Sequence, residues 1–492
     1  MRVYRGTFVN PLNDRRYIDF LRDHIVGVQD GTIAFVEPAS RLGEMATIHG
    51  FNPESDVSVF MGNQFFIPGM IDTHIHAPQY AFTGTATSCP LMEWLEKFTY
   101  PTESRFSDLG FAEQVYSKLI SRLLKNGCTT GLYYATIHNE SSLALARCAL
   151  RAGQRAFIGK VAMDRNAPDH YRQATATAIE ETERFILDAR QLNSGLTHPL
   201  VEPVVTPRFI PTCTSDLMSG LAALAAKHHC LIQTHAVESI DEVAFVKSLH
   251  DAEARHEDDA CHCSGGETGC LCERDIMILD KLGLLKPGTV LAHAVHLKEE
   301  EAALIKERGA AISHCPLSNY FFSQGVLPLR RCLDWGVTVG LGTDVAGGYA
   351  PSLLTAIRET VVSSRTLENR ELQEGRVGGP RLRSELRVTW REALWLATMG
   401  GAQSLMLANR LGSFAPGKLF DAVLVDPQAP GSPFDVFIDA AAGGERPRAQ
   451  GGLDTLEDIV EKYVNLGDDR NHVAVWVQGR EVVAAGGQLV AA

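Results

Sequence analysis

The chain has 492 residues, of which 45% are hydrophobic and 21% are charged, and this composition excludes a disordered, collagen-like or fibrous protein. The formal net charge is −13, from 46 basic and 59 acidic side chains, so binding to the phosphate backbone of nucleic acids is disfavoured. No apolar run approaches the roughly 18 residues of a membrane span, and residues 1–6 lack the apolar segment of a secretory signal. Eleven cysteines without such a signal indicate reduced thiols and a cytoplasmic protein.

Both ends of the chain predict a small β domain. Short alternating segments separated by turn residues occur at Arg2–Val9, Arg16–Val28, Thr32–Val36, Asp421–Val425 and Val473–Val483. Neither end has enough apolar residues for a core of its own. The simplest arrangement therefore pairs the two ends into one domain beside the middle of the chain.

The middle of the chain alternates β-branched apolar runs with longer helical patterns, which is typical of a parallel sheet with crossover helices. The eight runs are Phe66–His76, Thr129–Ile137, Ala156–Met163, Val201–Phe209, Leu231–Glu238, Val290–His296, Ala311–Cys315 and Val337–Asp344. The helical stretches include Phe111–Lys125, Ala176–Leu192, Ser215–Lys227 and Lys298–Arg308. Eight parallel strands close a TIM-type barrel, whereas an open doubly wound sheet usually has about five or six. The sequence therefore predicts an α/β protein with a (β/α)8 barrel.

Three segments fit neither pattern and are predicted to be loops. They are His250–Glu273, Glu368–Leu386 and Ala440–Gly452. The second and third are rich in Gly, Arg and Glu, so we expect them at the surface.

Three strand ends carry side chains that suit a metal ion. His74 and His76 close the first run, and strand alternation places both imidazoles on one face. The C-terminal ends of the other barrel strands bring His235 and Asp344 to the same rim. Three imidazoles and one carboxylate match a zinc site in ligand type and number, with one position left for water.

Two further residues would act on that water. Glu238 follows His235 by three positions and is placed to transfer protons, and His293 would orient the water or a developing oxyanion. Taken singly, His293 also fits a hydrogen-bonded core residue, and Asp344 also fits a cap of the following turn. It is the combination at four strand ends that indicates a catalytic site.

Other zinc chemistries lack their motifs in this chain. There is no Pro-Cys-X-X-Cys of base-flipping deaminases and no His-Glu-X-X-His of metalloproteases. The fourth run ends in Thr206-Pro207-Arg208-Phe209 without a lysine that could bridge two metals, which favours one metal ion. Lys160, on the third run, is predicted to be structural.

Several motifs together resemble the amidohydrolase superfamily and, within it, the guanine deaminase family. They are Pro68–Tyr80, Leu91–Leu95, Val205–Phe209, Thr234–Glu238, Ser313–Pro316, Gly340–Gly348 and Leu466–Asn471. The segment Pro68 to His76 is common to the superfamily, whereas Gln79-Tyr80 and Thr206-Pro207-Arg208-Phe209 single out the family. The resemblance covers nearly the whole chain. It implies a barrel over residues 68–404 and a β-sandwich from residues 1–67 and 405–492.

The resemblance also implies the roles of individual residues. Zinc would be held by His74, His76, His235 and Asp344. Catalysis would use Glu238, Asp344 and His293. The substrate would contact His76, Ala77, Pro78, Gln79, Arg208, Phe209, His235, Glu238 and Asp344. Relatives of this kind are homodimers, so a homodimer is expected.

The implied reaction converts guanine into xanthine and ammonia. Hydroxide generated at the zinc would attack C2 while Glu238 protonates N3, and Asp344 would take the proton of the water. Arg208 suits the O6 acceptor, and Gln79 can offer a donor and an acceptor to the ring edge. Phe209 would either stack on the ring or form the wall of the pocket. Alternatives are a related enzyme for another nucleobase or an aminotriazine, and a non-catalytic scaffold.

The chain departs from the family in three places. Leu317 replaces an expected Asn, and the predicted loops at 368–386 and 440–452 are longer than usual. An insertion places Cys261, Cys263, Cys270 and Cys272 within twelve residues. These thiols could hold a second, structural zinc, although Cys-X-Cys is tighter than the usual spacing of zinc ligands, and the alternative is a loop with reduced thiols.

Overall fold

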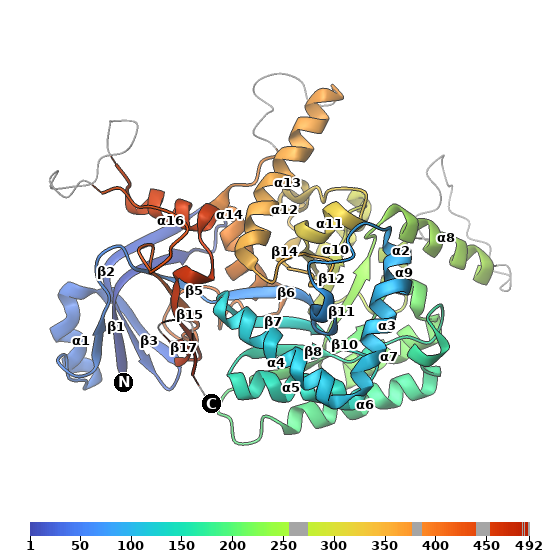
Figure 1. The fold of residues 1–492 in the computed structure, drawn as a ribbon, viewed down its shortest axis with the longest axis horizontal. Coiled ribbons are helices and arrows are strands. Elements are labelled where there is room, and N and C mark those ends of the chain that lie inside the picture. Colours follow the sequence, from blue (N-terminus) through green and yellow to red (C-terminus); the bar gives the residue numbers. More distant parts are fainter. Residues whose placement is uncertain (255–273, 376–385, 439–452, 485, 487, 491–492) are drawn as a thin grey trace.

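The computed structural model describes residues 1–254, 274–375, 386–438, 453–484, 486 and 488–490. A barrel surrounded by helices lies on the right of Figure 1, and a β domain lies on the left. Strands from the two ends of the chain, blue and red, belong to one sheet in this β domain. No helix in the described part of the chain is long and apolar enough to cross a bilayer.

The barrel consists of eight parallel strands in chain order. They are β6 (Met70–His76), β7 (Cys128–Tyr134), β8 (Arg155–Gly159), β10 (Val201–Pro207), β11 (Leu231–Ala236), β12 (Thr289–His293), β13 (Ala311–His314) and β14 (Thr338–Leu341), with the two-residue β9 (Val161–Ala162) paired to β10. The ring closes where Asp344 N donates to His74 O and His76 N donates to Val345 O, both at 2.9 Å. The predicted fold class is confirmed.

Helices cover the outside of the barrel (Figure 1). Those before β11 are α2 (Leu91–Trp94), α3 (Tyr100–Ser104), α4 (Leu109–Lys125), α5 (Asn139–Ala152), α6 (Thr175–Gln191) and α7 (Ser215–Lys227). Those after it are α8 (Ile240–Ala254), α9 (Asp275–Lys281), α10 (Glu299–Arg308), α11 (Pro316–Phe322), α12 (Leu329–Trp335), α13 (Leu353–Gln373), α14 (Trp390–Trp395) and α15 (Gly401–Ser404). Helix α4 shows why they form: Asp108 caps its first turn, and Val115, Leu119 and Leu123 recur on one buried face.

The β domain is one continuous sheet built from both chain ends. Its strands are β1 (Arg2–Pro11), β2 (Ile18–Gln29), β3 (Thr32–Pro38), β4 (Val57–Val59), β5 (Phe65–Pro68), β15 (Ala422–Val425), β16 (His472–Val477), β17 (Arg480–Ala484) and β18 (Gln488–Leu489), with helices α1 (Leu42–His49) and α16 (Leu456–Leu466) beside them. The two ends meet where β5 pairs antiparallel with β15. Tyr4, Phe66, Phe420 and Trp476 pack as an aromatic core. The expected pairing of the chain ends is confirmed.

Two predicted boundaries are wrong. The first apolar run is two strands, because β5 belongs to the β domain and β6 to the barrel, with Gly69 between them. A Cβ at Gly69 would lie 2.2 Å from the Thr129 hydroxyl, so only glycine allows this crossing. The predicted loop at Glu368–Leu386 begins too early, since α13 continues to Gln373 while Glu368 pairs with Arg387 at 2.8 Å.

The other predicted loops fall largely outside the described residues. Helix α8 extends to Ala254, so the N-terminal part of the loop predicted at His250–Glu273 is helical. Residues 255–273, with the four closely spaced cysteines, and residues 440–452 lie outside the described part of the chain.

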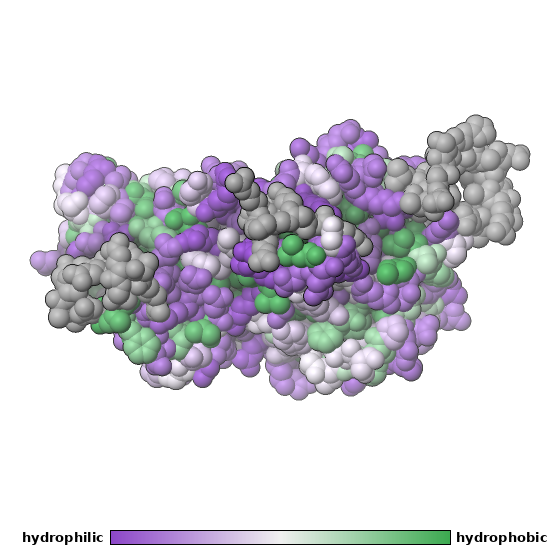
Figure 2. Space-filling view, turned by 90° about the horizontal axis from the view of Figure 1, so that it is seen from above, coloured by the Kyte–Doolittle hydropathy of each residue, from purple (hydrophilic) through white to green (hydrophobic). Residues whose placement is uncertain are grey.

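Figure 2 shows one face of the molecule from above. Hydrophilic residues cover most of this face, and hydrophobic residues form separate patches rather than one continuous field. Scattered exposed apolar side chains are ordinary for a folded protein.

A buried ion pair joins the barrel to the β domain. Arg155 on β8 donates to both carboxylate oxygens of Asp421, which precedes β15, at 2.5 and 3.3 Å. Both side chains are only 4% exposed. Because removal of one partner leaves a buried charge unpaired, we expect Asp421→Asn to lower the free energy of unfolding by roughly 3–5 kcal/mol, measured by urea denaturation.

The matched control is an exposed pair of the same type. Asp23 accepts from Arg5 at 2.7 Å, but the two side chains are 56% and 32% exposed. Asp23→Asn should therefore change the free energy of unfolding by no more than about 1 kcal/mol. Equal effects of the two substitutions would contradict the role given to burial.

Candidate active site

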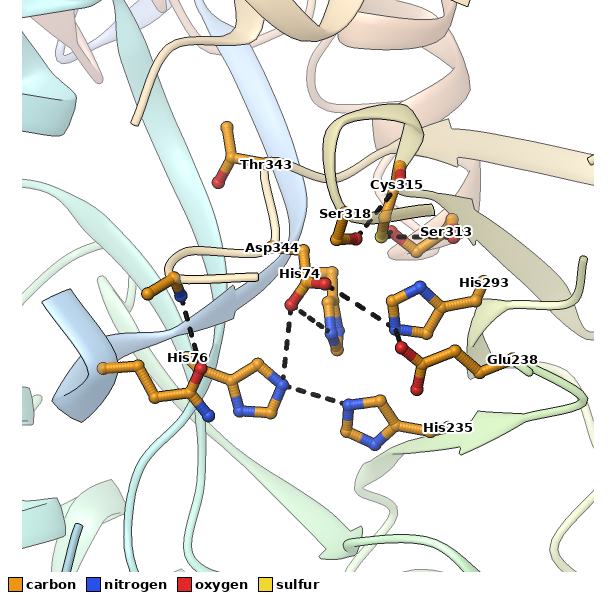
Figure 3. A network of polar contacts seen from close by, with 12 residues as sticks. His74, His76, His235, Glu238, His293, Ser313, Cys315, Ser318, Thr343 and Asp344 are labelled. Carbon is orange, nitrogen blue, oxygen red and sulfur yellow. Dashed lines mark hydrogen bonds and ion pairs between the residues drawn. The ribbon is translucent and has the colours of Figure 1, made fainter. Parts of the chain in front are cut away.

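Imidazoles and one carboxylate meet at the C-terminal rim of the barrel (Figure 3). His76 Nε2 lies 3.0 Å from His235 Nε2, although β6 and β11 are far apart in the sequence. Asp344 Oδ1 lies 3.2 Å from His74 Nε2 and 3.7 Å from His76 Nε2. All four side chains are buried. The structure thus brings together the four residues predicted to hold a metal ion.

The protonation state of these side chains suits the binding of a cation. His235 Nδ1 lies 2.7 Å from the carbonyl oxygen of Arg208, which can only accept, so Nε2 of His235 carries the lone pair. His74 Nε2 is buried without a hydrogen-bond partner. Burial lowers the pKa of His74, His76 and His235 well below the usual value, so these imidazoles are neutral. Lone pairs that converge in this way are the donor set of a metal site.

Within the described residues, two sets of three side chains could hold a metal ion, and both lie here. They are His74, His76 and Asp344, and His74, His235 and His293. Lys160 is not part of either set: its ammonium is buried and donates to Gln173 Oε1 at 2.8 Å.

Glu238 and His293 lie beside the converging ligands (Figure 3). His293 Nε2 is 3.7 Å from Glu238 Oε1 and 3.8 Å from Asp344 Oδ2. His293 Nδ1 faces Asn319 Oδ1 at 3.1 Å and therefore carries the proton, which leaves Nε2 as an acceptor. Burial, and then the charge of Asp344, raise the pKa of Glu238 well above the usual value. A carboxyl group of this kind can hold and release a proton near neutral pH.

The backbone is strained at three of these strand ends. Val237, His293 and Asp344 have φ angles of 45°, 70° and 50°, in the left-handed region that side chains other than glycine disfavour. Such conformations cost about 1–3 kcal/mol each and are kept where the surroundings fix them. They turn the side chains after the strands into the rim.

Buried carboxylates hold the segments that carry the site. Asp72 accepts from His74 N at 3.1 Å and from the Thr343 hydroxyl at 2.6 Å, and burial raises the pKa of Asp72 to about 7. Glu242 Oε2 accepts from Glu238 N at 2.6 Å. Sequence reasoning missed both residues, although Ser239-Ile240-Asp241-Glu242 is a capping-box pattern that could have revealed Glu242.

A cavity with about 400 Å³ of empty space, partly open to solvent, adjoins the ligands. Its lining residues are His76, Gln79, Leu91, Trp94, Leu95, Arg208, Phe209, His235, Glu238, His293, Phe322, Asp344 and Gly347. Ala77 and Pro78, predicted to contact substrate, are buried on the short helix after β6 and do not belong to this lining. Apolar side chains from α2 and α11 form one wall, which suits a flat, largely apolar ligand.

The polar end of the cavity contains Gln79 and Arg208, which share a partner. Arg208 donates to the two oxygens of Glu103 at 2.7 and 3.2 Å, and Gln79 Nε2 donates to Oε1 of the same carboxylate at 2.9 Å. No local sequence motif identifies Glu103, so sequence reasoning missed it. Leu317, the departure noted above, is a buried apolar residue on α11.

A barrel with a candidate metal-ligand set, a carboxyl group of raised pKa and a small cavity at its C-terminal rim is typical of a hydrolase that uses a metal ion. The sequence pattern of the amidohydrolase family matches residues 65–482, and the chain belongs to this family. Within it, the chain belongs with the guanine deaminases. It is 41% identical to guanine deaminase from Mus musculus and 40% identical to that from Homo sapiens, in both cases over 98% of this chain and 96% of the relative.

A solved structure of similar shape comes from the same family. It is guanine deaminase from C. acetobutylicum with bound guanine in the active site, which is 30% identical and has a TM-score of 0.78. The match covers 98% of this chain and 99% of the other.

Proposed function

We propose that this protein hydrolyses guanine to xanthine and ammonia with one zinc ion per chain. The observation that carries the proposal is the shared cavity. Three of the proposed ligands (His76, His235 and Asp344), the carboxyl group of Glu238 and the guanidinium of Arg208 line the same space, and His74 completes the ligand set beside it. The related guanine deaminases support guanine as the substrate.

The zinc ligands in this proposal are His74, His76, His235 and Asp344. Zinc bound there would lower the pKa of a water molecule to about 7 and so supply a nucleophile at neutral pH. The chain fixes the lone pairs in advance. Arg208 O holds the His235 ring at 2.7 Å, and Asp72 braces the backbone of His74 at 3.1 Å.

Three side chains would move or hold protons. Glu238 protonates N3 of guanine as the oxygen of water bonds to C2, and Asp344 accepts the proton that this water loses. The exocyclic amine then takes the proton that Asp344 holds and leaves C2 as ammonia, while the new hydroxyl group at C2 returns a proton to Glu238, so guanine and water become xanthine and ammonia. His293, with its Nδ1 proton held by Asn319, keeps an acceptor at Nε2 to orient the water.

The rest of the cavity would bind the purine. Arg208 and Gln79 would contact the O6 and N7 edge, where guanine has two acceptors. Phe209 would either stack on the ring or form the wall; its ring centroid is 6.1 Å from that of His235. His76 would complete the contacts at the end of β6, whereas Ala77 and Pro78, which do not line the cavity, are not proposed to touch the purine.

The test is an assay of the zinc-loaded protein with guanine. We expect one ammonia and one xanthine per guanine consumed, and zinc at one equivalent per chain. A panel of adenine, cytosine and an aminotriazine should give far lower kcat/KM. A higher kcat/KM for a panel member would favour the alternative of a related hydrolase with another substrate, and no turnover of any compound would contradict an enzyme.

Domain limits, assembly and compartment extend the proposal. We place the β domain in residues 1–67 and 405–492 and the barrel in residues 68–404, supported by the end of β5 at Pro68 and of α15 at Ser404. A homodimer is proposed from the family resemblance and is tested by light scattering. The seven described cysteines are free thiols, which suits the proposed cytoplasmic location.

A further inference from the structure

We propose that Glu103 is a positioning residue that makes the site selective for a purine with an oxo group at C6. It would do so by holding Arg208 and Gln79 as hydrogen-bond donors at the polar end of the cavity. The inference rests on the proposed function, since it deepens how that site chooses its substrate.

Glu103 lies behind the cavity. Its side chain comes from α3, is fully buried and is absent from the cavity lining, whereas its partners Arg208 and Gln79 belong to that lining. Both carboxylate oxygens are saturated: Oε1 accepts from Gln79 and Arg208, and Oε2 accepts from Arg208 at 2.7 Å and from the Tyr171 hydroxyl at 2.8 Å. Glu103 can therefore act on a ligand only through these neighbours.

The partners of Gln79 fix which way its amide points. A carboxylate only accepts, so the Gln79 atom that lies 2.9 Å from Glu103 is the NH2 group. A backbone N–H only donates, so the atom that faces Ala346 N at 3.3 Å is the oxygen. Both neighbours impose the same orientation. The Gln79 amide thus has its oxygen engaged away from Glu103 and its NH2 group beside Arg208.

Arg208 adds only donors to this end of the cavity. A guanidinium has five N–H groups and no acceptor, and two of them serve Glu103. The Arg208 charge is buried and is balanced by Glu103, with the Tyr100 ring 5.4 Å away on another side. A neutral ligand can therefore meet the remaining N–H groups without leaving an unpaired buried charge.

A donor-only edge selects between purines that differ at C6. Guanine and hypoxanthine present two acceptors, O6 and N7, whereas adenine presents N7 and an amino donor. A glutamine recognises adenine by offering its oxygen to that amino group, and Glu103 with Ala346 prevents this orientation of Gln79. Glu103→Gln would replace the charged carboxylate, which only accepts hydrogen bonds, by an amide that can also donate. The Gln79 amide could then turn and present its oxygen to the cavity.

The experiment measures binding of hypoxanthine and adenine to the zinc-loaded full chain by calorimetry. Both ligands lack the amine at C2, so the readout does not depend on guanine turnover. We expect the wild type to bind hypoxanthine more tightly, and Glu103→Gln to lower this preference by roughly 10-fold or more, the scale of a lost charge-assisted hydrogen bond. In the guanine assay, KM should rise more than kcat falls.

Two further variants separate positioning from stability. Glu103→Asp keeps the charge, so its preference for hypoxanthine should lie between those of the wild type and Glu103→Gln. If Glu103→Gln does not fold, Glu103→Asp takes its place in the binding experiment. Asp421→Asn breaks another buried arginine–carboxylate pair, remote from the cavity lining, and should leave the preference unchanged while lowering stability.

Some outcomes would overturn the inference. One is an unchanged preference in a folded, zinc-loaded Glu103 variant. Another is an equal loss of the preference for hypoxanthine in Glu103→Asp and Glu103→Gln. That result would mean that the preference depends on the packing of the Glu103 side chain and not on its acceptor-only carboxylate. A different result would separate the two proposals. If the wild type does not deaminate guanine but prefers hypoxanthine, and only the Glu103 variants lose this preference, the proposed function is contradicted and the role of Glu103 is retained.

Discussion

Glu238→Gln is expected to keep the metal ion bound and to lower kcat for guanine by roughly 10²- to 10⁴-fold, the usual contribution of general acid–base catalysis. The amide has the size of the carboxyl group but cannot give a proton to the purine ring. Glu238 lies beside His293, 3.7 Å away, and belongs to neither set of candidate metal ligands. Ammonia release and zinc content, measured on the same preparation, check the prediction.

A control for this variant comes from a buried glutamate outside the cavity. Glu371 on α13 is buried and accepts from Arg331 at 2.7 Å. Glu371→Gln should cost some stability and leave kcat close to that of the wild type. A Glu238→Gln protein that keeps near-normal turnover, or one that loses its zinc, would refute the role proposed for Glu238.

Removal of zinc by a chelator is expected to abolish measurable ammonia release and to lower Tm. The loss of activity follows because the neutral imidazoles and Asp344 cannot themselves generate hydroxide. Tm falls because a ligand that binds only the folded protein stabilises it, by about 4 kcal/mol when its free concentration is 1,000 times Kd. Zn²⁺ should restore both quantities, and a differential scanning measurement with an activity assay tests this.

Substitutions of single histidines sharpen the test. His235→Gln should lower the bound zinc to well below one equivalent, because its Nε2 is one of the converging ligand atoms. His472 on β16 is equally buried but bonds to the Tyr463 hydroxyl at 2.7 Å, so His472→Gln should retain one zinc. Full activity after exhaustive chelation would rule out a metal-dependent reaction.

Much of the barrel could be predicted from local sequence, since each strand is a short apolar run between helical patterns. The boundary at Gly69 could not, because nothing in a continuous apolar run shows that its two halves pair with different sheets. The end of α13 was missed for a similar reason: Glu368 looks like a loop residue until Arg387 is known to pair with it.

The candidate site divides in the same way. His74, His76, His235 and Asp344 were predictable because strand ends of a barrel share one rim, whatever their distance in the chain. Glu103 was not, because its significance depends on Arg208, which is 105 residues further along and belongs to another element. Glu103, which holds Arg208 from behind the cavity, therefore leaves a signal only in three dimensions.

The crossing at Gly69 also determines how the molecule can be divided. Because one residue separates β5 from β6, no linker exists there at which the barrel could be cut free. A fragment that started at Met70 would lose the strand that joins the N-terminal strands to β15, and its first element would be the one that carries His74 and His76. We therefore expect the two parts to unfold together rather than as interchangeable modules, and fraying at β5 would reach the first imidazole within a few residues.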